Sequence, residues 1–128
     1  MMEFLLVFVG GGIGSALRHG INLVSLRLLG AQFQYPLGTF CINVAGSFLM
    51  GLVIEYGALR SGLPQHGRLF LTTGILGGFT TFSTFALEIG LLNSRGETAA
   101  AALYAMGSVA VGLGALYAGM SLVRALSA

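Results

Sequence analysis

The stretch Gly77-Gly78-Phe79-Thr80-Thr81-Phe82-Ser83-Thr84-Phe85 lies in the middle of an otherwise apolar segment. Two adjacent glycines followed by β-branched and hydroxyl residues have low helix propensity, so the sequence predicts a helix break here. In a membrane, the carbonyl groups that a break releases must meet protein, water or an ion, and broken helices often hold ions at the midplane of the bilayer. The alternative is a glycine-kinked but continuous helix, whose threonine hydroxyls bond back to carbonyls.

The composition around this stretch is that of a membrane protein. Hydrophobic residues make up 55% of the 128 residues and charged residues 8%, and the mean hydropathy is +0.90, far outside the soluble range. A helix that crosses a bilayer needs about 20 mostly apolar residues. The sequence therefore predicts an all-α membrane protein, a single domain over residues 1–128, with four spans at Phe4–Leu29, Leu37–Ile54, Leu69–Leu92 and Thr98–Val123.

The first of these spans carries polar residues in its second half. We expect it to form one retained helix rather than a cleaved signal peptide, because no small-residue cleavage site followed by a polar mature region is present. Arg18 and Asn22 should then face protein or a water-filled vestibule, since an Arg at the centre of a helix in lipid costs about 2.5–3.5 kcal/mol. The alternative is a re-entrant segment, which would reverse the topology.

Small residues recur four positions apart in three of the spans. Residues of this kind allow helix backbones to approach closely in lipid. We therefore expect tight helix packing at the following positions: Gly10 and Gly14; Gly74 and Gly78; Ala110, Gly114 and Ala118.

The charges give no preferred orientation in the membrane. Every basic residue is an Arg and every acidic residue a Glu. With four spans, one side of the membrane carries Arg60, Arg68 and Arg124. The other side carries Arg27 and Arg95, joined by Arg18 if that residue is counted as flanking the span. Cytoplasmic segments normally carry an excess of Lys and Arg, so this balance favours insertion in both orientations and an antiparallel homodimer. The alternative is that other features, such as span hydrophobicity, fix one orientation.

Several classes of function are excluded by the same inventory. Scattered Arg residues among apolar runs make no basic stripe for nucleic acid. The single Cys41 excludes a disulfide within one chain, and two His without clustered carboxylates argue against a metalloenzyme. The sequence contains no nucleophilic residue at a plausible spacing from a residue that could act as its general base. We therefore expect no enzymatic activity.

Uncharged polar side chains lie on defined faces of the predicted helices. Thr39, Asn43 and Ser47 are four apart on the second span, as are Tyr104 and Ser108 on the fourth, so each set projects from one face. Such donors in lipid normally face the bundle interior; interhelical hydrogen bonding without a transport role is the alternative.

Two further features of the third span suggest function. Phe82 and Phe85 are three apart and share a helical face, although an aromatic stripe in a membrane helix more often packs or contacts lipid. Glu88 is a carboxylate inside a span, which suggests a functional role by default. It could couple transport to protons, or it could accept hydrogen bonds from another helix.

Three motifs resemble the Fluc family of bacterial fluoride channels. They are GGGIGSALR at residues 10–18, GTFCIN at residues 38–43 and, most specifically, GGFTTFSTF at residues 77–85. The resemblance covers essentially the whole chain. It implies a multi-pass protein of the bacterial inner membrane that forms a dual-topology antiparallel homodimer with two anion pores. It also implies a structural sodium ion at the dimer centre, bound by the backbone carbonyls of Gly77 and Thr80 from each subunit.

The resemblance also implies which residues line the fluoride pathway. The paired aromatic positions match Phe82 and Phe85, and the pore Asn matches Asn43. The remaining pathway positions are Thr39, Tyr104, Ser108, Glu88, Ser83 and Thr84.

The chemistry of these side chains suits fluoride. Fluoride is small and strongly hydrated, so a pore must replace its water with hydrogen-bond donors at close quarters. Amides, hydroxyls and the positive edges of phenyl rings can do this without a fixed cation. We therefore expect a fluoride-selective channel that exports cytoplasmic fluoride passively and lowers its toxicity.

Two other functions compete with this interpretation. A proton-coupled small multidrug-type transporter would use Glu88, but such transporters usually place the Glu in the first span beside Trp residues, and this chain contains no Trp. A non-transporting scaffold subunit would leave the helix break without an explanation.

Overall fold

The computed structural model describes residues 1–30, 36–60 and 63–127, and every regular element within these ranges is a helix. Four helical spans are long and apolar enough to cross a membrane, as the sequence predicts. The third span is composite and contains a π-helix, η1. The elements are α1 (Met2–Leu29), α2 (Leu37–Arg60), α3 (Gln65–Leu69), η1 (Phe70–Leu76), α4 (Gly77–Phe79), α5 (Phe82–Ser94) and α6 (Thr98–Ser127).

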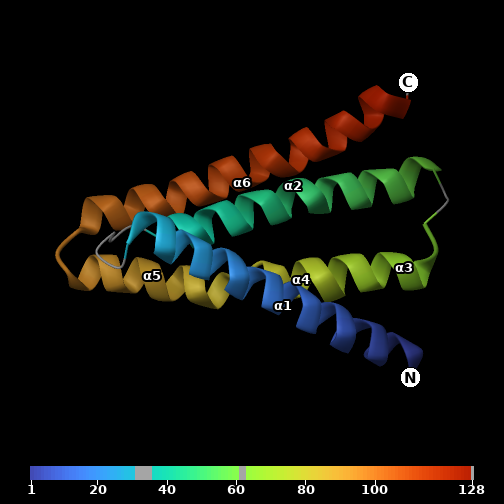
Figure 1. Ribbon diagram of the computed structural model, residues 1–128. Helices are drawn as coiled ribbons and strands as arrows, with labels where there is room; N and C mark the ends of the chain where they lie inside the picture. The colour runs from blue at the N-terminus through green and yellow to red at the C-terminus, as the bar shows by residue number, and fades with distance from the viewer. Residues whose placement is uncertain (31–35, 61–62, 128) are drawn as a thin grey trace.

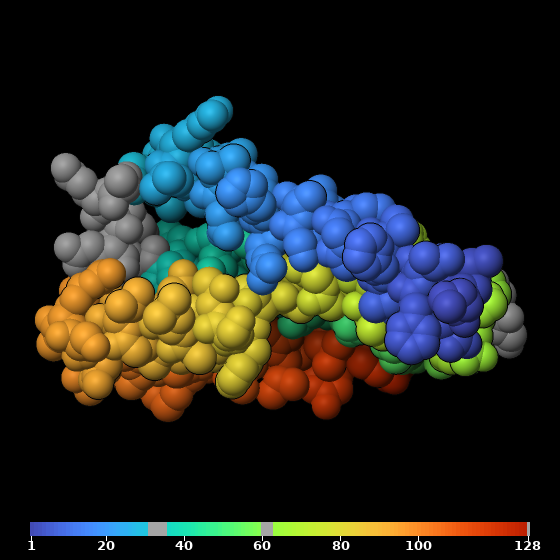
Figure 2. Space-filling model, turned by 90° about the horizontal axis from the view of Figure 1, so that it is seen from below, coloured from blue at the N-terminus to red at the C-terminus, as the bar shows by residue number. Residues whose placement is uncertain are grey.

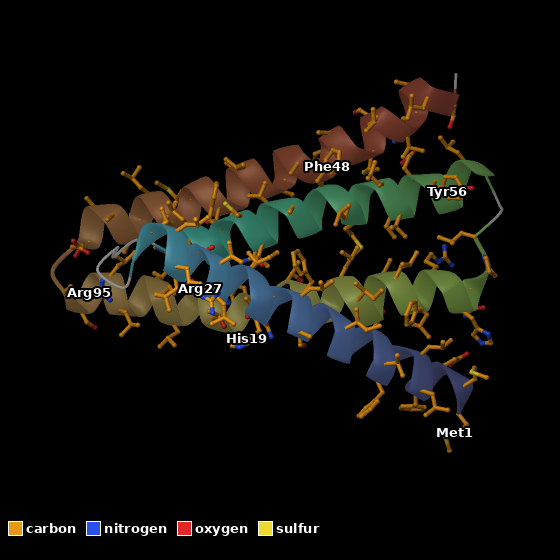
Figure 3. The ribbon with its side chains drawn as sticks, viewed as in Figure 1. Met1, His19, Arg27, Phe48, Tyr56 and Arg95 are labelled. Carbon is orange, nitrogen blue, oxygen red and sulfur yellow. The ribbon has the colours of Figure 1, made fainter. Side chains whose placement is uncertain are left out.

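The spans run back and forth along one long axis (Figure 1). Helices α2 and α6 lie side by side, whereas α1 crosses the third span and contacts η1 and α4. Both termini lie at the same end of the molecule (Figure 1), and Figure 3 shows Met1 and Tyr56 at that end with Arg95 at the other. Because α1 is continuous over 28 residues, the re-entrant alternative is wrong.

The third span breaks at Thr80 and Thr81. Thr80 (φ −82°, ψ 159°) and Thr81 (φ −151°, ψ 123°) are extended, and they separate α4 from α5. The predicted break is confirmed, and the continuous kinked helix is excluded. Gly77 itself keeps helical angles (φ −63°, ψ −39°), so the glycines precede the break rather than form it.

The glycines before the break serve helix packing. A Cβ added to Gly14 would collide with the carbonyl of Ile75, and one added to Gly78 would collide with the carbonyl of Gly11. At Gly10, the added atom would lie 2.9 Å from the Cα of Gly74. The predicted close packing of these two glycine pairs is therefore confirmed, and it joins α1 to the third span backbone to backbone.

The small-residue stripe predicted for the fourth span lies on an exposed face of α6 in the described part of the subunit. Ala110, Gly114 and Ala118 are exposed, and a Cβ on Gly114 would meet no atom within 4 Å. Helix α6 instead meets α2 through Gly119, where a Cβ would collide with the carbonyl of Phe48, and through Gly51 on α2, which faces the carbonyl of Leu116. The four-residue spacing of small residues therefore did not predict which face of α6 packs against α2.

A second correction concerns the end of the second span, which the sequence predicts at Ile54, just before Glu55. Helix α2 extends to Arg60, and Glu55 lies inside it with an exposed fraction of 6%. Its carboxylate accepts hydrogen bonds from Arg124 of α6, at 2.7 Å from Nε and 3.3 Å from Nη2. Glu55, like Glu88, is therefore a carboxylate within a span, and its ion pair joins α2 to α6 near the end that carries the termini.

Candidate functional site

An open groove beside the helix break contains much of the predicted pathway. Its volume is about 420 Å³. Among its lining residues are six that the sequence singled out: Asn43, Ser47, Thr80, Phe82, Phe85 and Ser108. The ring of Phe82 is 79% exposed, so the groove opens on the outer face of the subunit. Polar groups from α2 and α6 thus share one cavity with the break and the aromatic pair.

The side chain of Asn43 holds the backbone of the break. Its Oδ1 accepts a hydrogen bond from the Thr81 N–H at 2.9 Å, and its Nδ2 donates to the Thr81 carbonyl at 3.1 Å. Thr81 is extended, so one side chain satisfies both of its backbone groups, as a neighbouring β-strand would. One N–H of the Asn43 amide remains after this pairing, because a primary amide carries two.

The break deprives the carbonyls before it of their helical donors, those of Gly77 and Thr80 among them. In an uninterrupted α-helix the Thr81 N–H would donate to the carbonyl of Gly77, but it donates to Asn43 Oδ1 instead. The Thr84 N–H would likewise donate to the carbonyl of Thr80, but it donates to the Thr81 hydroxyl at 3.2 Å. Gly77 and Thr80 are the residues whose carbonyls the family resemblance implies as cation ligands.

A chain of aromatic contacts leads away from the break. The ring centroids of Phe82 and Phe85 are 6.0 Å apart and the rings are tilted by 55°. Phe85 in turn meets Tyr104 of α6 edge to face, with centroids 5.1 Å apart. Rings in these orientations present edges, which carry partial positive charge, rather than stacked faces.

Glu88 lies beyond these rings, and its carboxylate accepts hydrogen bonds from side chains of two other helices. The Thr39 hydroxyl donates to Glu88 Oε2 at 3.1 Å, and the Tyr104 hydroxyl donates to Glu88 Oε1 at 3.0 Å. Thr39 is 3% exposed. Each carboxylate oxygen therefore has one donor, and the three side chains form a cluster that joins α2, α5 and α6.

Sequence comparison identifies the family of this chain. Residues 5–120 match the model of the family described as CrcB-like protein, Camphor Resistance (CrcB). The chain belongs to the CrcB-like family. The resemblance that the three motifs predict is confirmed, because curated relatives in this comparison are named as fluoride-specific FluC channels.

Relatives in the CrcB-like family match over nearly their full length. A "Fluoride-specific ion channel FluC" from Methylobacterium nodulans is 57% identical over 97% of this chain and 98% of its own. Proteins with the same name from Rhodopseudomonas palustris and Granulibacter bethesdensis are each 55% identical over 98% of this chain, covering 100% and 98% of their own lengths. The chain is therefore a multi-pass bacterial membrane protein of a family of channels and not of enzymes.

The structure divides the predicted residues of this CrcB-like protein into two groups and leaves two outside them. Asn43, Phe82, Phe85 and Ser108 line the groove, and Ser108 Oγ is buried with no hydrogen bond to any described residue. Thr39, Glu88 and Tyr104 form the second cluster. Ser83 and Thr84 belong to neither: Ser83 is exposed, and the backbone of Thr84 receives the cap from Thr81.

Thr81 has a role that the sequence did not predict. Its hydroxyl caps α5, and its backbone pairs with Asn43. A Thr directly before a helical segment is an N-cap signal, and Thr81 directly precedes α5. The sequence alone does not identify the N-cap, because the neighbouring Thr80 is an equally good candidate.

Proposed function

We propose that this chain is one subunit of a fluoride-selective channel that exports cytoplasmic fluoride passively across the bacterial inner membrane and thereby lowers its toxicity. The observation that carries the proposal is the groove beside the break. There, the amide of Asn43, the ring of Phe85 and the hydroxyl of Ser108, which bonds to no described residue, come together without a cationic side chain. The printed names of the relatives support the same ion.

The path of the anion follows from these donors. Fluoride must exchange water for donors at each step, and a site must bind it weakly enough to release it. The remaining N–H of Asn43 and the Ser108 hydroxyl are neutral donors, which meet both requirements. From there the rings of Phe82 and Phe85 lead to Tyr104, whose hydroxyl is bonded to Glu88. Thr39, Ser83 and Thr84 supply further hydroxyls in the proposed pathway.

We propose that a second copy covers the groove in an antiparallel homodimer. An open groove on the outer face of a single subunit would expose its few hydrogen-bond donors to hydrocarbon, where an anion cannot travel. Phe82, at 79% exposed, extends from this face. The balanced Arg residues on the two ends of the molecule support insertion of the two copies in opposite orientations.

The residues at the break fit a structural sodium ion between the two copies. The carbonyls of Gly77 and Thr80 have lost their helical donors, and carbonyl oxygens without carboxylates suit an alkali ion. A bound sodium would supply a fixed positive charge that holds the paired breaks together. Gly77→Val should therefore shift purified protein from dimer to monomer on size-exclusion chromatography, and dialysis against N-methylglucamine should lower its thermal stability. An intact dimer and an unchanged melting temperature would contradict the sodium site.

Ion efflux from liposomes tests the channel function directly. Purified protein in vesicles loaded with potassium fluoride should release fluoride when a potassium ionophore carries the countercharge, and vesicles loaded with potassium chloride should release far less. Release of both ions at similar rates, or of neither, would refute the proposal. Fluoride release that proceeds without the ionophore and follows a proton gradient would instead indicate coupled transport through Glu88.

A further inference from the structure

A second cavity lies at the far side of Glu88, between three helices. Its volume is about 200 Å³. Asn22 and Ser25 line it from the end of α1, Gly38 and Thr39 from the start of α2, and Glu88 from α5. In Figure 2 a hollow is visible between the light-blue part of α1 and the yellow-orange α5, with the teal start of α2 at its floor. We call this cavity the α1–α2 chamber.

Gly38 sets the width of the α1–α2 chamber. A Cβ built on Gly38 would lie 2.9 Å from Asn22 Oδ1 and 3.3 Å from Ser25 Oγ. A real side chain at this position would therefore push against both polar groups and fill part of the cavity. Gly38 lies in the first turn of α2, and the absence of a side chain there leaves room in the cavity.

The chamber continues the line of contacts that starts in the groove. Thr39 and Glu88 line the chamber and bond to each other, and Glu88 also bonds to Tyr104. Tyr104 meets Phe85, which lines the groove. Two cavities in the subunit are thus separated by one hydrogen-bonded cluster and one aromatic contact.

We propose that the α1–α2 chamber is a hydrated binding site for the small inorganic anion, in which Asn22 and Ser25 replace part of its water and Gly38 keeps the space open. The proposal rests on the fluoride channel function and adds residues to its pathway. A water molecule has a share of liquid volume of about 30 Å³, so the chamber has room for an anion with several waters. The amide of Asn22 and the hydroxyl of Ser25 supply donors for that anion.

The first experiment narrows the chamber. Gly38→Ala should lower fluoride efflux from liposomes several-fold while the protein remains a folded dimer. Gly20→Ala, in α1 where an added Cβ meets nothing within 4 Å, is the matched control and should keep the wild-type rate. Wild-type efflux through folded Gly38→Ala would overturn the proposal.

The second experiment removes the donors and leaves the space. Asn22→Leu and Ser25→Ala should each raise the fluoride concentration that gives half-maximal efflux, because each removes a donor without closing the cavity. These variants decide the question if Gly38→Ala does not fold. An unchanged concentration dependence in both would overturn the binding role.

A third measurement is independent of transport. In a Cys41→Ser background, Ser25→Cys should react with a small charged methanethiosulfonate reagent, and adding Gly38→Ala should slow this reaction several-fold. Val24→Cys, on the adjacent exposed position, should show no such slowing. If wild-type protein releases no fluoride, the proposed channel function is refuted. The labelling still reports whether water reaches the chamber. Equal labelling of Ser25→Cys with and without Gly38→Ala would overturn the role of Gly38.

Discussion

Asn43 satisfies two backbone groups of a residue that lies outside any helix. Thr81 is 9% exposed, and its N–H and carbonyl both bond to the Asn43 side chain. Backbone polar groups in a membrane cannot turn to water for partners. The break therefore depends on a side chain from another span, and the same amide has one N–H left for the groove.

Asn43→Ala should destabilise the protein as well as slow transport. It leaves the N–H and the carbonyl of Thr81 without partners, and a buried unsatisfied group costs about 1–3 kcal/mol. Ser47→Ala, one turn further along the same face, is the control and should have a much smaller effect on stability. Thermal unfolding in detergent measures both. Equal melting temperatures for the two variants would show that the pairing does not stabilise the break.

Phe82→Ile should reduce fluoride efflux while the subunit remains folded. Isoleucine keeps the apolar bulk but removes the ring edge that an anion would contact. Because Phe82 is 79% exposed in the subunit, its loss should cost little internal packing. Phe8→Ile is a matched control, since Phe8 is also 79% exposed but lies on α1. Full fluoride flux through Phe82→Ile would indicate that the ring only packs, in this case against the second copy.

The elements are held together largely by backbone contact. Helix α1 lies against the third span through glycines, and α6 lies against α2 in the same way. Between helices in lipid there is little hydrophobic driving force, so close van der Waals packing supplies the association. Helix α1 crosses next to α4, which means that this packing also fixes the segment in front of the break.

Gly14→Val should disrupt this crossing, and Gly12→Val should not. A Cβ on Gly14 would collide with the backbone of Ile75, whereas one on Gly12 meets no atom within 4 Å. Because a backbone carbonyl cannot rotate away, the helices would have to separate. We expect Gly14→Val to yield little folded protein by size-exclusion chromatography, with Gly12→Val close to wild type. Comparable yields would contradict the backbone contact.

Breaking the Glu55–Arg124 pair should reveal an asymmetry between its partners. Glu55 is buried, whereas the Arg124 side chain is 60% exposed. Arg124→Gln leaves a buried carboxylate without its partner, which is costly; Glu55→Gln leaves an Arg that can reach water. Arg124→Gln should therefore melt at the lower temperature. The double variant Glu55→Gln, Arg124→Gln should recover part of the loss, and equal effects of the two single changes would contradict this reasoning.

The sequence predicted those features of the elements that local chemistry determines. Low helix propensity located the break, and glycine spacing located the crossing of α1. The face of α6 could not be predicted, because small residues occur on more than one face and the choice depends on where Phe48 and Leu116 lie. Glu55 was assigned to a connection because a charge normally marks a helix end. Its partner Arg124 is 69 residues away, and only the fold brings the two together.

At the scale of the whole molecule, the charges remain balanced between the two ends. Arg95 lies at the end opposite Met1 and Tyr56 (Figure 3), and Arg68 lies in α3 near the termini. Arg124 of α6 lies at that end too, paired with Glu55. The folded subunit thus retains no strong asymmetry that would favour one orientation, and its groove is open on the face where a second copy would dock.

Labelling in cells should show both orientations of this subunit. A single Cys replaces Ser94 in the Ser94–Gly96 connection, in a Cys41→Ser background because Cys41 is exposed. A membrane-impermeant thiol reagent added outside the inner membrane should label about half of the protein, and permeabilisation should make the rest reactive, since balanced Arg residues favour neither orientation. Adding three Arg residues after Ala128 is the control: it should drive the C-terminus to the cytoplasm and leave the new Cys outside. Full protection or full labelling of the starting variant would show a single orientation and contradict the antiparallel dimer.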